Sequence, residues 1–124
     1  MEMMIDTSLI NEDEAKEKIT EGLISLRKNP LTGAVQEIYL YESVGWYKNK
    51  LRYWVNRVKH SKHELDQLRK RYPESTLSIP TSNLNWDIRS LIKARKDIEL
   101  NLNPSQYPKE YYYEIPEYEF SAAA

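Results

Sequence analysis

Two histidines and a neighbouring carboxylate are the side chains best placed to bind a metal. His60, His63 and Glu64 would share one face of a helix, where imidazole and carboxylate groups can chelate a divalent cation. Lys59 and Lys62 would repel that cation, and the chain has no other histidine and no cysteine to complete its coordination. The spacing also differs from the His-Glu-x-x-His pattern of metalloproteases. We therefore expect a solvated histidine pair, and neither a metal nor another cofactor.

Other catalytic arrangements have little support. A chain without cysteine excludes thiol catalysis, iron–sulfur clusters and cysteine-ligated zinc. Its three glycines are scattered and form no phosphate-binding loop. Glu14, Glu17 and Glu21 are spaced along one helical stretch, but no second carboxylate pair of matching spacing follows them. We expect no enzymatic activity and no small-molecule substrate. The competing hypothesis is a metal-assisted enzyme that uses the two histidines and a distant carboxylate.

The strongest positive signal is a basic stretch interleaved with aromatic residues, over 46–57. Its lysines and arginines could neutralise phosphates, while its rings could stack on unpaired bases. Alternatively, the rings pack in a core while the basic side chains lie along apolar surface with their charges in water. We favour the packed helix and keep, as the alternative function, a nucleic-acid-binding accessory protein that uses helix 46–71. The residues that would contact a nucleic acid or another anionic partner are Lys48, Lys50, Arg52, Arg57 and Lys59.

A net charge of -1 conceals an uneven distribution of charge. Residues 1–28 carry seven acids and four bases, and residues 48–71 carry nine bases and two acids. The last segment, 104–124, carries four glutamates and one lysine. This pattern favours either an anionic partner for the basic middle or acidic ends that fold back onto it. For the C-terminal segment we favour folding back, because the required positive surface is in the same chain.

The elements that must position these residues are predicted to be helices. Asn11 is a plausible N-cap of a helix over 11–28. A stretch of some 40 residues without proline predicts one long helix over 33–72, with a kink near Gly45. Apolar residues at every third or fourth position predict a further helix over 83–102. The predicted fold class is therefore all-α.

Two stretches depart from this helical pattern. Residues 38–41 have a strand-like composition, but we assign them to the long helix because no second strand is available to pair with them. Residues 104–124 combine tyrosine, glutamate and proline without a helical period, which predicts an extended acidic tail. The predicted organisation is a helical domain over 1–103 followed by this tail.

Two long helices joined by a short connection predict an antiparallel, coiled-coil-like hairpin with the first helix packed across one end. Its apolar lines would stay partly exposed unless a partner or a second copy covered them. The expected function is therefore assembly or regulation through protein–protein contacts, with a homo-oligomer as the expected state. The residues predicted to form the protein interface are Leu51, Trp54, Val58, Leu65, Leu84, Leu91, Tyr111, Tyr112 and Tyr113.

The location of the protein is predicted from what the chain lacks. Residues 1–6 have neither the basic nor the apolar region of a secretory signal. No apolar run approaches the roughly 20 residues that a membrane-spanning helix needs. We expect a soluble, cytoplasmic protein that makes no membrane contact.

Overall fold

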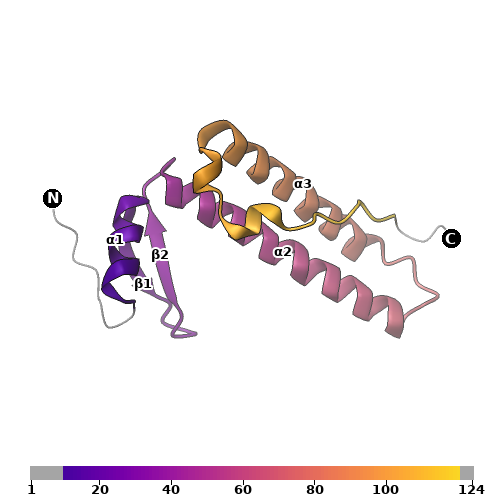
Figure 1. Ribbon diagram of the computed structural model, residues 1–124. Coiled ribbons are helices and arrows are strands. Elements are labelled where there is room, and N and C mark those ends of the chain that lie inside the picture. The colour runs from indigo at the N-terminus through magenta and orange to yellow at the C-terminus, as the bar shows by residue number, and fades with distance from the viewer. Residues whose placement is uncertain (1–9, 121–124) are drawn as a thin grey trace. The chain divides into compact units, whose positions relative to one another are not determined.

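Three α-helices and one two-stranded antiparallel sheet make up the chain in the computed structural model, which describes residues 10–120 (Figure 1). Residues 1–6, considered above for a signal, and the last four residues of the predicted tail lie outside this range. The elements in chain order are α1 (Glu12–Thr20), β1 (Leu23–Lys28), β2 (Val35–Tyr39), α2 (Val44–Arg71), α3 (Ser78–Asn101) and the 3₁₀ turns η1 (Pro104–Gln106) and η2 (Lys109–Tyr112). The chain divides into two units, residues 1–49 and 50–124, and each is described by itself.

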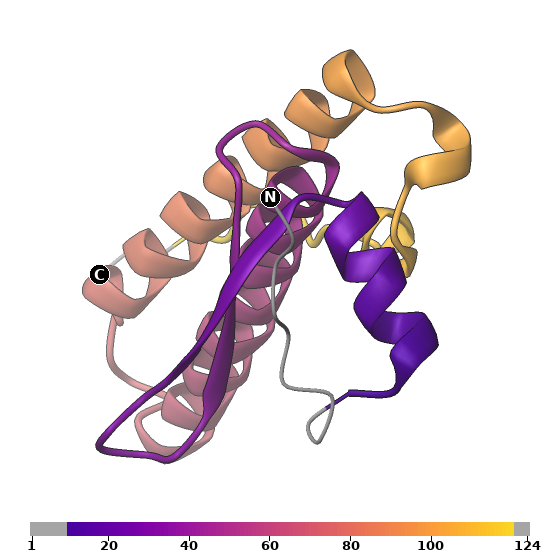
Figure 2. The ribbon, with the colours of Figure 1, turned by 90° about the vertical axis from the view of Figure 1, so that its left-hand side faces the viewer.

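The predicted all-α fold class is wrong because part of the chain forms a β-hairpin. β1 and β2 pair antiparallel, with Leu23 opposite Tyr39 and Lys28 opposite Val35 (Figure 2). The first helix therefore ends at Thr20 instead of continuing to residue 28. Residues 23 and 26 are apolar, and their spacing of three residues fits one face of a helix. The chain nevertheless begins β1 at Leu23, shortly after α1 ends at Thr20.

The turn over residues 29–34 joins two strands and not two helices. The Asn29 N–H donates to the Ala34 carbonyl at 2.7 Å, and the Asn29 side-chain oxygen accepts from the backbone N–H of Leu31 at 2.9 Å. Such local hydrogen bonds from asparagine are typical of turns. The strand-like residues 38–41 lack a partner only if 23–28 is helical, and β1 supplies that partner.

In the first unit, the β-hairpin packs against α1 and the first turn of α2. Asn11 caps α1 as predicted, because its side-chain oxygen accepts from the Glu14 N–H at 2.8 Å. Lys18 of α1 donates to Glu37 and to the Tyr39 hydroxyl of β2, both at 3.0 Å. Burial lowers the pKa of the Lys18 ammonium, but these two hydrogen bonds outweigh it and leave the pKa above its ordinary value.

The predicted helix over 33–72 is instead β2, a turn and α2. α2 begins at Val44, so Gly45 lies in its first turn, where the Gly45 N–H donates to the Glu21 carbonyl at 2.8 Å. No residue of the first turn of α2 is acidic, and Ser43 accepts from the Trp46 N–H at 3.1 Å. The glycine therefore marks the start of the helix and not a kink within it.

The second unit is a pair of long antiparallel helices, α2 from Lys50 onward and α3 (Figure 1). α3 begins at Ser78, before the predicted residue 83, because a proline is tolerated in the first turn of a helix, where Pro80 lies. The side chains that are almost fully buried here are Leu51, Val55, Val58, Leu65, Leu84, Ile88, Leu91, Ala94 and Ile98. They recur at helical spacing on the facing sides of the two helices.

The tail, residues 104–120 of the described chain, returns along the helical pair through η1 and η2 (Figure 1). Its extended part follows α2 in the same direction, since Glu110 lies near Arg52 and Glu119 lies near Lys62. The predicted extended segment therefore contains two short 3₁₀ turns. Within residues 10–120, no helix is both long enough and apolar enough to cross a membrane.

Candidate functional site

The five residues predicted to contact an anionic partner are divided between the two units. Lys48 belongs to the first unit and pairs with the largely buried Glu21 carboxylate. Lys50, Arg52, Arg57 and Lys59 belong to the second unit. All five were predicted to lie on one helix, and that helix continues through both units.

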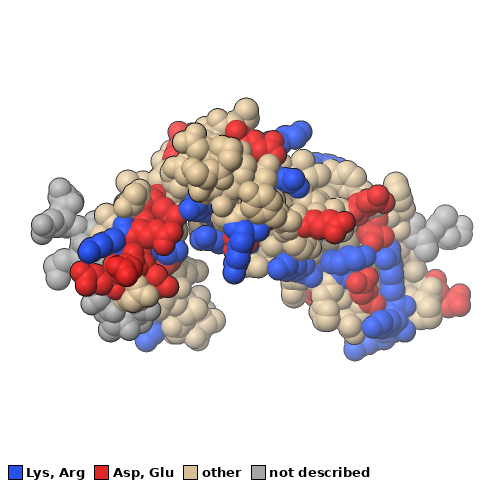
Figure 3. Space-filling view, viewed as in Figure 1, with Lys and Arg blue, Asp and Glu red and all other residues tan. Residues whose placement is uncertain are grey.

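Each of the four cations in the second unit has a partner within that unit. Lys50 Nζ lies 3.4 Å from Asp97, Arg52 Nε lies 3.4 Å from Glu110, and Arg57 lies 3.6 Å from Asp87. The Lys59 ammonium lies 5.3 Å from the centre of the Tyr113 ring, within the range of a cation–π interaction. Figure 3 shows acidic side chains interspersed with the lysines and arginines along the helical pair. The basic stretch is therefore largely satisfied by its own chain.

One of these partners, Asp87 of α3, is a buried acid that the sequence analysis did not identify. Its exposed fraction is 1%, and its carboxylate accepts a hydrogen bond from the Ser61 hydroxyl of α2. The Arg57 guanidinium lies at the edge of the same group. A buried carboxylate needs such partners because leaving water is costly. Asp87 therefore links α2 to α3.

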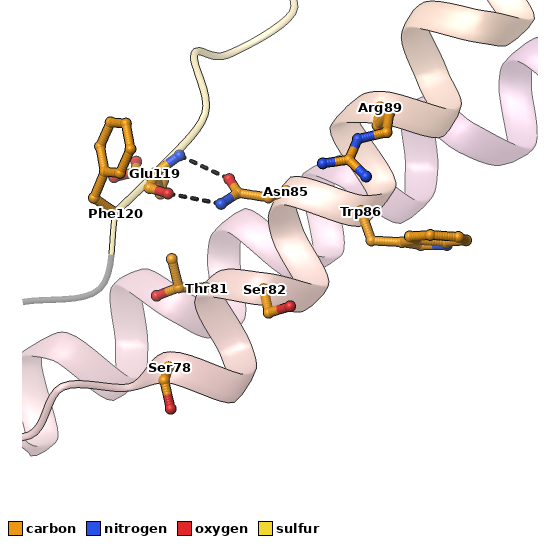
Figure 4. A pocket seen from close by; sticks show the side chains of 8 residues that line it. All are labelled: Ser78, Thr81, Ser82, Asn85, Trp86, Arg89, Glu119 and Phe120. Carbon is orange, nitrogen blue, oxygen red and sulfur yellow. Dashed lines mark hydrogen bonds between the residues drawn. The ribbon is translucent and has the colours of Figure 1, made fainter.

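The end of the tail is held by Glu119, which contacts both long helices. Its carboxylate accepts from Lys62 at 2.7 Å and from Arg69 at 3.3 Å, both on α2. On α3, the Asn85 side chain donates to the Glu119 carbonyl at 2.7 Å and accepts from the Glu119 N–H at 2.8 Å (Figure 4). The prediction that the acidic tail folds back onto the basic helix is confirmed by these contacts.

We expect this tail contact to weaken in acid. The hydrogen bonds from Lys62 and Arg69 outweigh partial burial and hold the pKa of Glu119 below its ordinary value of 4.5. A lowered pKa in the folded state stabilises the contact above that ordinary value, and the contribution is lost as the pH falls through the lowered pKa. Two-dimensional NMR of the Glu119 amide and the Asn85 side-chain amide should show both signals moving together over that interval.

Two glutamine variants test this assignment. Glu119→Gln should weaken the tail contact at neutral pH and remove the acid transition from the Asn85 signals. Glu117→Gln is the matched control, because Glu117 is exposed and lies in the same extended segment. An acid transition of Asn85 that is unchanged in Glu119→Gln would contradict the assignment.

The leucines and the valine predicted to form a protein interface lie in the core of the helical pair. Leu51, Val58 and Leu65 of α2 and Leu84 and Leu91 of α3 are all at most 1% exposed. The structure brings these residues together, but it does so between the two helices of one chain. They could meet a partner only if the pair opened.

The predicted aromatic interface residues lie closer to the surface. Trp54 is half-buried and packs edge-to-face on Tyr53. The Tyr111 hydroxyl donates to Glu99 of α3 at 2.7 Å, and the Arg95 guanidinium lies 4.9 Å from the centre of the Tyr111 ring. Tyr112 is exposed, whereas Tyr113 is half-buried. Tyr111 therefore attaches the tail to α3, and Tyr113 lies against Lys59 of α2.

A second line of residues runs along the opposite side of α3, and we name it the outer α3 seam. It consists of Ile79, Ser82, Trp86, Arg89, Lys93, Lys96 and Leu100. All seven side chains are exposed, and they recur with alternating steps of three and four residues. The sequence analysis missed this line because it followed the more apolar one from Leu84, although the same spacing is readable in the sequence.

The outer α3 seam borders a hollow of about 310 Å³ where the tail ends. Three seam residues, Ser82, Trp86 and Arg89, line this hollow together with Glu119 and Phe120 of the tail. Figure 4 shows Asn85 pointing toward the tail, whereas Trp86 points away from it. The described part of the tail, residues 104–120, therefore covers one flank of α3 and leaves the side chains of the seam exposed.

His60 and Glu64 are two of the side chains considered above as metal ligands. His60 Nε2 lies 3.5 Å from the Glu64 carboxylate, and both side chains are exposed. Within residues 10–120, no group of three or more histidines, aspartates and glutamates is arranged to hold a metal ion. No family model, curated protein or solved structure matches the chain.

Proposed function

We propose that the chain is a non-enzymatic protein-interaction module, acting in assembly or regulation, that binds another protein through the outer α3 seam. The observation that supports this proposal is the exposure of the large apolar side chains of the seam: Ile79, Trp86 and Leu100 are 74%, 62% and 81% exposed. Scattered exposed apolar residues need no explanation. These three lie on one line whose spacing of three and four residues is that of helices packing against each other.

The alternative, nucleic-acid binding through the basic helix, has less support. Its candidate residues Arg52 and Arg57 are paired with Glu110 and Asp87, and Lys59 packs on Tyr113. A phosphate backbone would have to displace these partners before it could gain from their charges. We therefore prefer a protein partner.

Self-association through the seam would be opposed by charge. Two copies packed seam to seam would bring Arg89, Lys93 and Lys96 of one copy near the same cations of the other, and like charges at close range repel. We therefore propose a different protein as the partner on this surface. The expected homo-oligomer stays a prediction, which light scattering checks as a mass above 14.8 kDa.

Site-specific photo-crosslinking tests the proposed function. A photoreactive amino acid is placed at Trp86 or at Leu100, and the protein is irradiated in cells that naturally express it. The control carries the same group at Tyr72, which is also exposed but lies beyond the end of α2. We expect a discrete adduct from both seam positions, because a docked partner would lie within reach of each.

The pattern of adducts decides the outcome. An adduct of the same mass from Trp86 and Leu100, and none from Tyr72, supports the proposal. No adduct from either seam position, or equal adducts from all three positions, overturns it. Circular dichroism of each purified variant checks that the helices are intact.

A further inference from the structure

We infer that the partner of the outer α3 seam is an acidic amphipathic helix of another protein, an inference that rests on the proposed function. The seam contains three cations, Arg89, Lys93 and Lys96, and no acidic residue. No ion pair to any of these three is found among residues 10–120. Five cations of α2, by contrast, have acidic partners within the second unit: Lys50 and Arg57 pair with acids of α3, and Arg52, Lys62 and Arg69 pair with acids of the tail.

Neighbouring acids do not neutralise the seam because they serve other contacts. Asp97 pairs with Lys50 of α2, and Glu99 accepts from the Tyr111 hydroxyl of the tail. Glu99 also lies 3.9 Å from Arg95, which is not a seam residue. The positive charge of the seam is therefore available to a partner with negative charge at matching positions.

The ends of the seam indicate a helix and not a nucleic acid. Ile79 and Leu100 are aliphatic and lie 21 positions apart, which is roughly 31 Å along a helix at 1.5 Å per residue. Aliphatic side chains gain from covering by other apolar groups, which a phosphate backbone does not offer. A partner helix of similar length, apolar at both ends and acidic in the middle, matches the order of groups along the seam.

The chain itself shows how its helices bind acidic peptide. The tail approaches α2 with Glu110 at Arg52 and Glu119 at Lys62 and Arg69. These are carboxylate contacts to exposed or half-buried cations on a helix surface, the kind that the seam would make with a partner. The precedent favours protein carboxylates over phosphates as the natural counter-charge.

Fluorescence anisotropy with designed probes tests the inference. The first probe is a fluorescein-labelled helical peptide of about 22 residues, the length of the seam, with leucines at both ends and glutamates at the three positions that would face Arg89, Lys93 and Lys96. The second replaces those glutamates with glutamine. The third is a labelled single-stranded oligonucleotide of about 20 nucleotides.

Matched charge variants locate the binding surface on the full chain. The triple variant Arg89→Glu/Lys93→Glu/Lys96→Glu should weaken binding of the acidic peptide at least about tenfold, because three attractive pairs become repulsive. The control Lys70→Glu/Arg71→Glu/Lys109→Glu makes the same change in net charge at three other exposed positions and should change the affinity less than about twofold. Arg89→Gln/Lys93→Gln/Lys96→Gln replaces the first variant if charge reversal reduces helicity.

Each result has a defined meaning. The inference holds if the acidic peptide binds more tightly than the glutamine peptide and only the seam variant loses binding. It is overturned if the acidic peptide does not bind, if both triple variants lose binding equally, if the oligonucleotide binds more tightly, or if light scattering shows self-association that the seam variant abolishes. A seam-specific crosslink to a partner without acidic helices would contradict this inference and leave the proposed function intact.

Discussion

Leu91→Ala should cost about 2–5 kcal/mol of unfolding free energy, whereas Leu100→Ala should change it by less than about 0.5 kcal/mol. Both leucines lie on α3, but Leu91 is 1% exposed and Leu100 is 81% exposed. Removing a buried side chain loses its transfer free energy and leaves a cavity between α2 and α3. Removing the exposed one loses little buried area, and alanine is a strong helix former. Urea unfolding followed by circular dichroism measures both values.

The comparison also separates the two faces of α3 in function. Leu100→Ala should leave the fold intact while it weakens partner binding at the seam, because Leu100 is a seam residue. Leu91→Ala should reduce stability without removing any seam side chain. Equal losses of stability in the two variants would show that α3 does not bury the face described above, and the outer seam would then lose its basis.

Gly22→Ala should destabilise the protein by about 2–4 kcal/mol, the second large effect that we expect. Gly22 has a φ of 96°, where an L-residue is strained. A Cβ atom there would lie 2.5 Å from Ser43 Cβ and 2.8 Å from Ser43 Oγ, which is closer than real side chains approach. The backbone cannot move freely to relieve this clash, because the Gly22 carbonyl accepts from the Leu40 N–H at 2.8 Å.

Gly33→Ala is the matched control for this substitution. Gly33 also has a positive φ, 73°, but the nearest atom to an added Cβ would be the end of the flexible Lys28 side chain at 3.9 Å. Its cost should therefore be the backbone strain alone, about 1–2 kcal/mol. Urea unfolding gives the free energy of unfolding of each variant, and the difference between the two losses is the cost of the clash at Gly22. If Gly22→Ala costs no more than Gly33→Ala, the close packing of the α1–β1 turn against Ser43 is wrong.

The stability effect of Leu91→Ala bears on function because the seam needs a rigid support. A helix surface binds a partner with less loss of conformational entropy when its other face is packed. α3 is packed on α2 through its core line and is held on one flank by the tail contacts at Asn85 and Glu99. The acidic tail therefore stabilises the helical pair, and the proposed partner would bind a surface that is already formed.

Long-range pairing explains what could not be read from the sequence. The spacing of Leu23 and Leu26 fits a helical period, whereas the decisive interaction, the pairing of β1 with β2, depends on hydrogen bonds between residues that lie up to 16 positions apart, from Leu23 opposite Tyr39 to Lys28 opposite Val35. Local propensity describes each segment alone and does not reveal that the partner strand exists. For the same reason, the burial of Asp87 could not be predicted, because its hydrogen-bond partner Ser61 lies on another helix.

Features that depend on neighbours along the chain could be read from the sequence. These include the Asn11 cap of α1, the apolar line of α3 and the opposite charges of the tail and α2. The folded chain was needed to show which of the two lines on α3 is covered and which cations are neutralised. The physical reason is that burial and ion pairing depend on distances between residues far apart in sequence, whereas helical spacing and capping depend on residues within one or two turns.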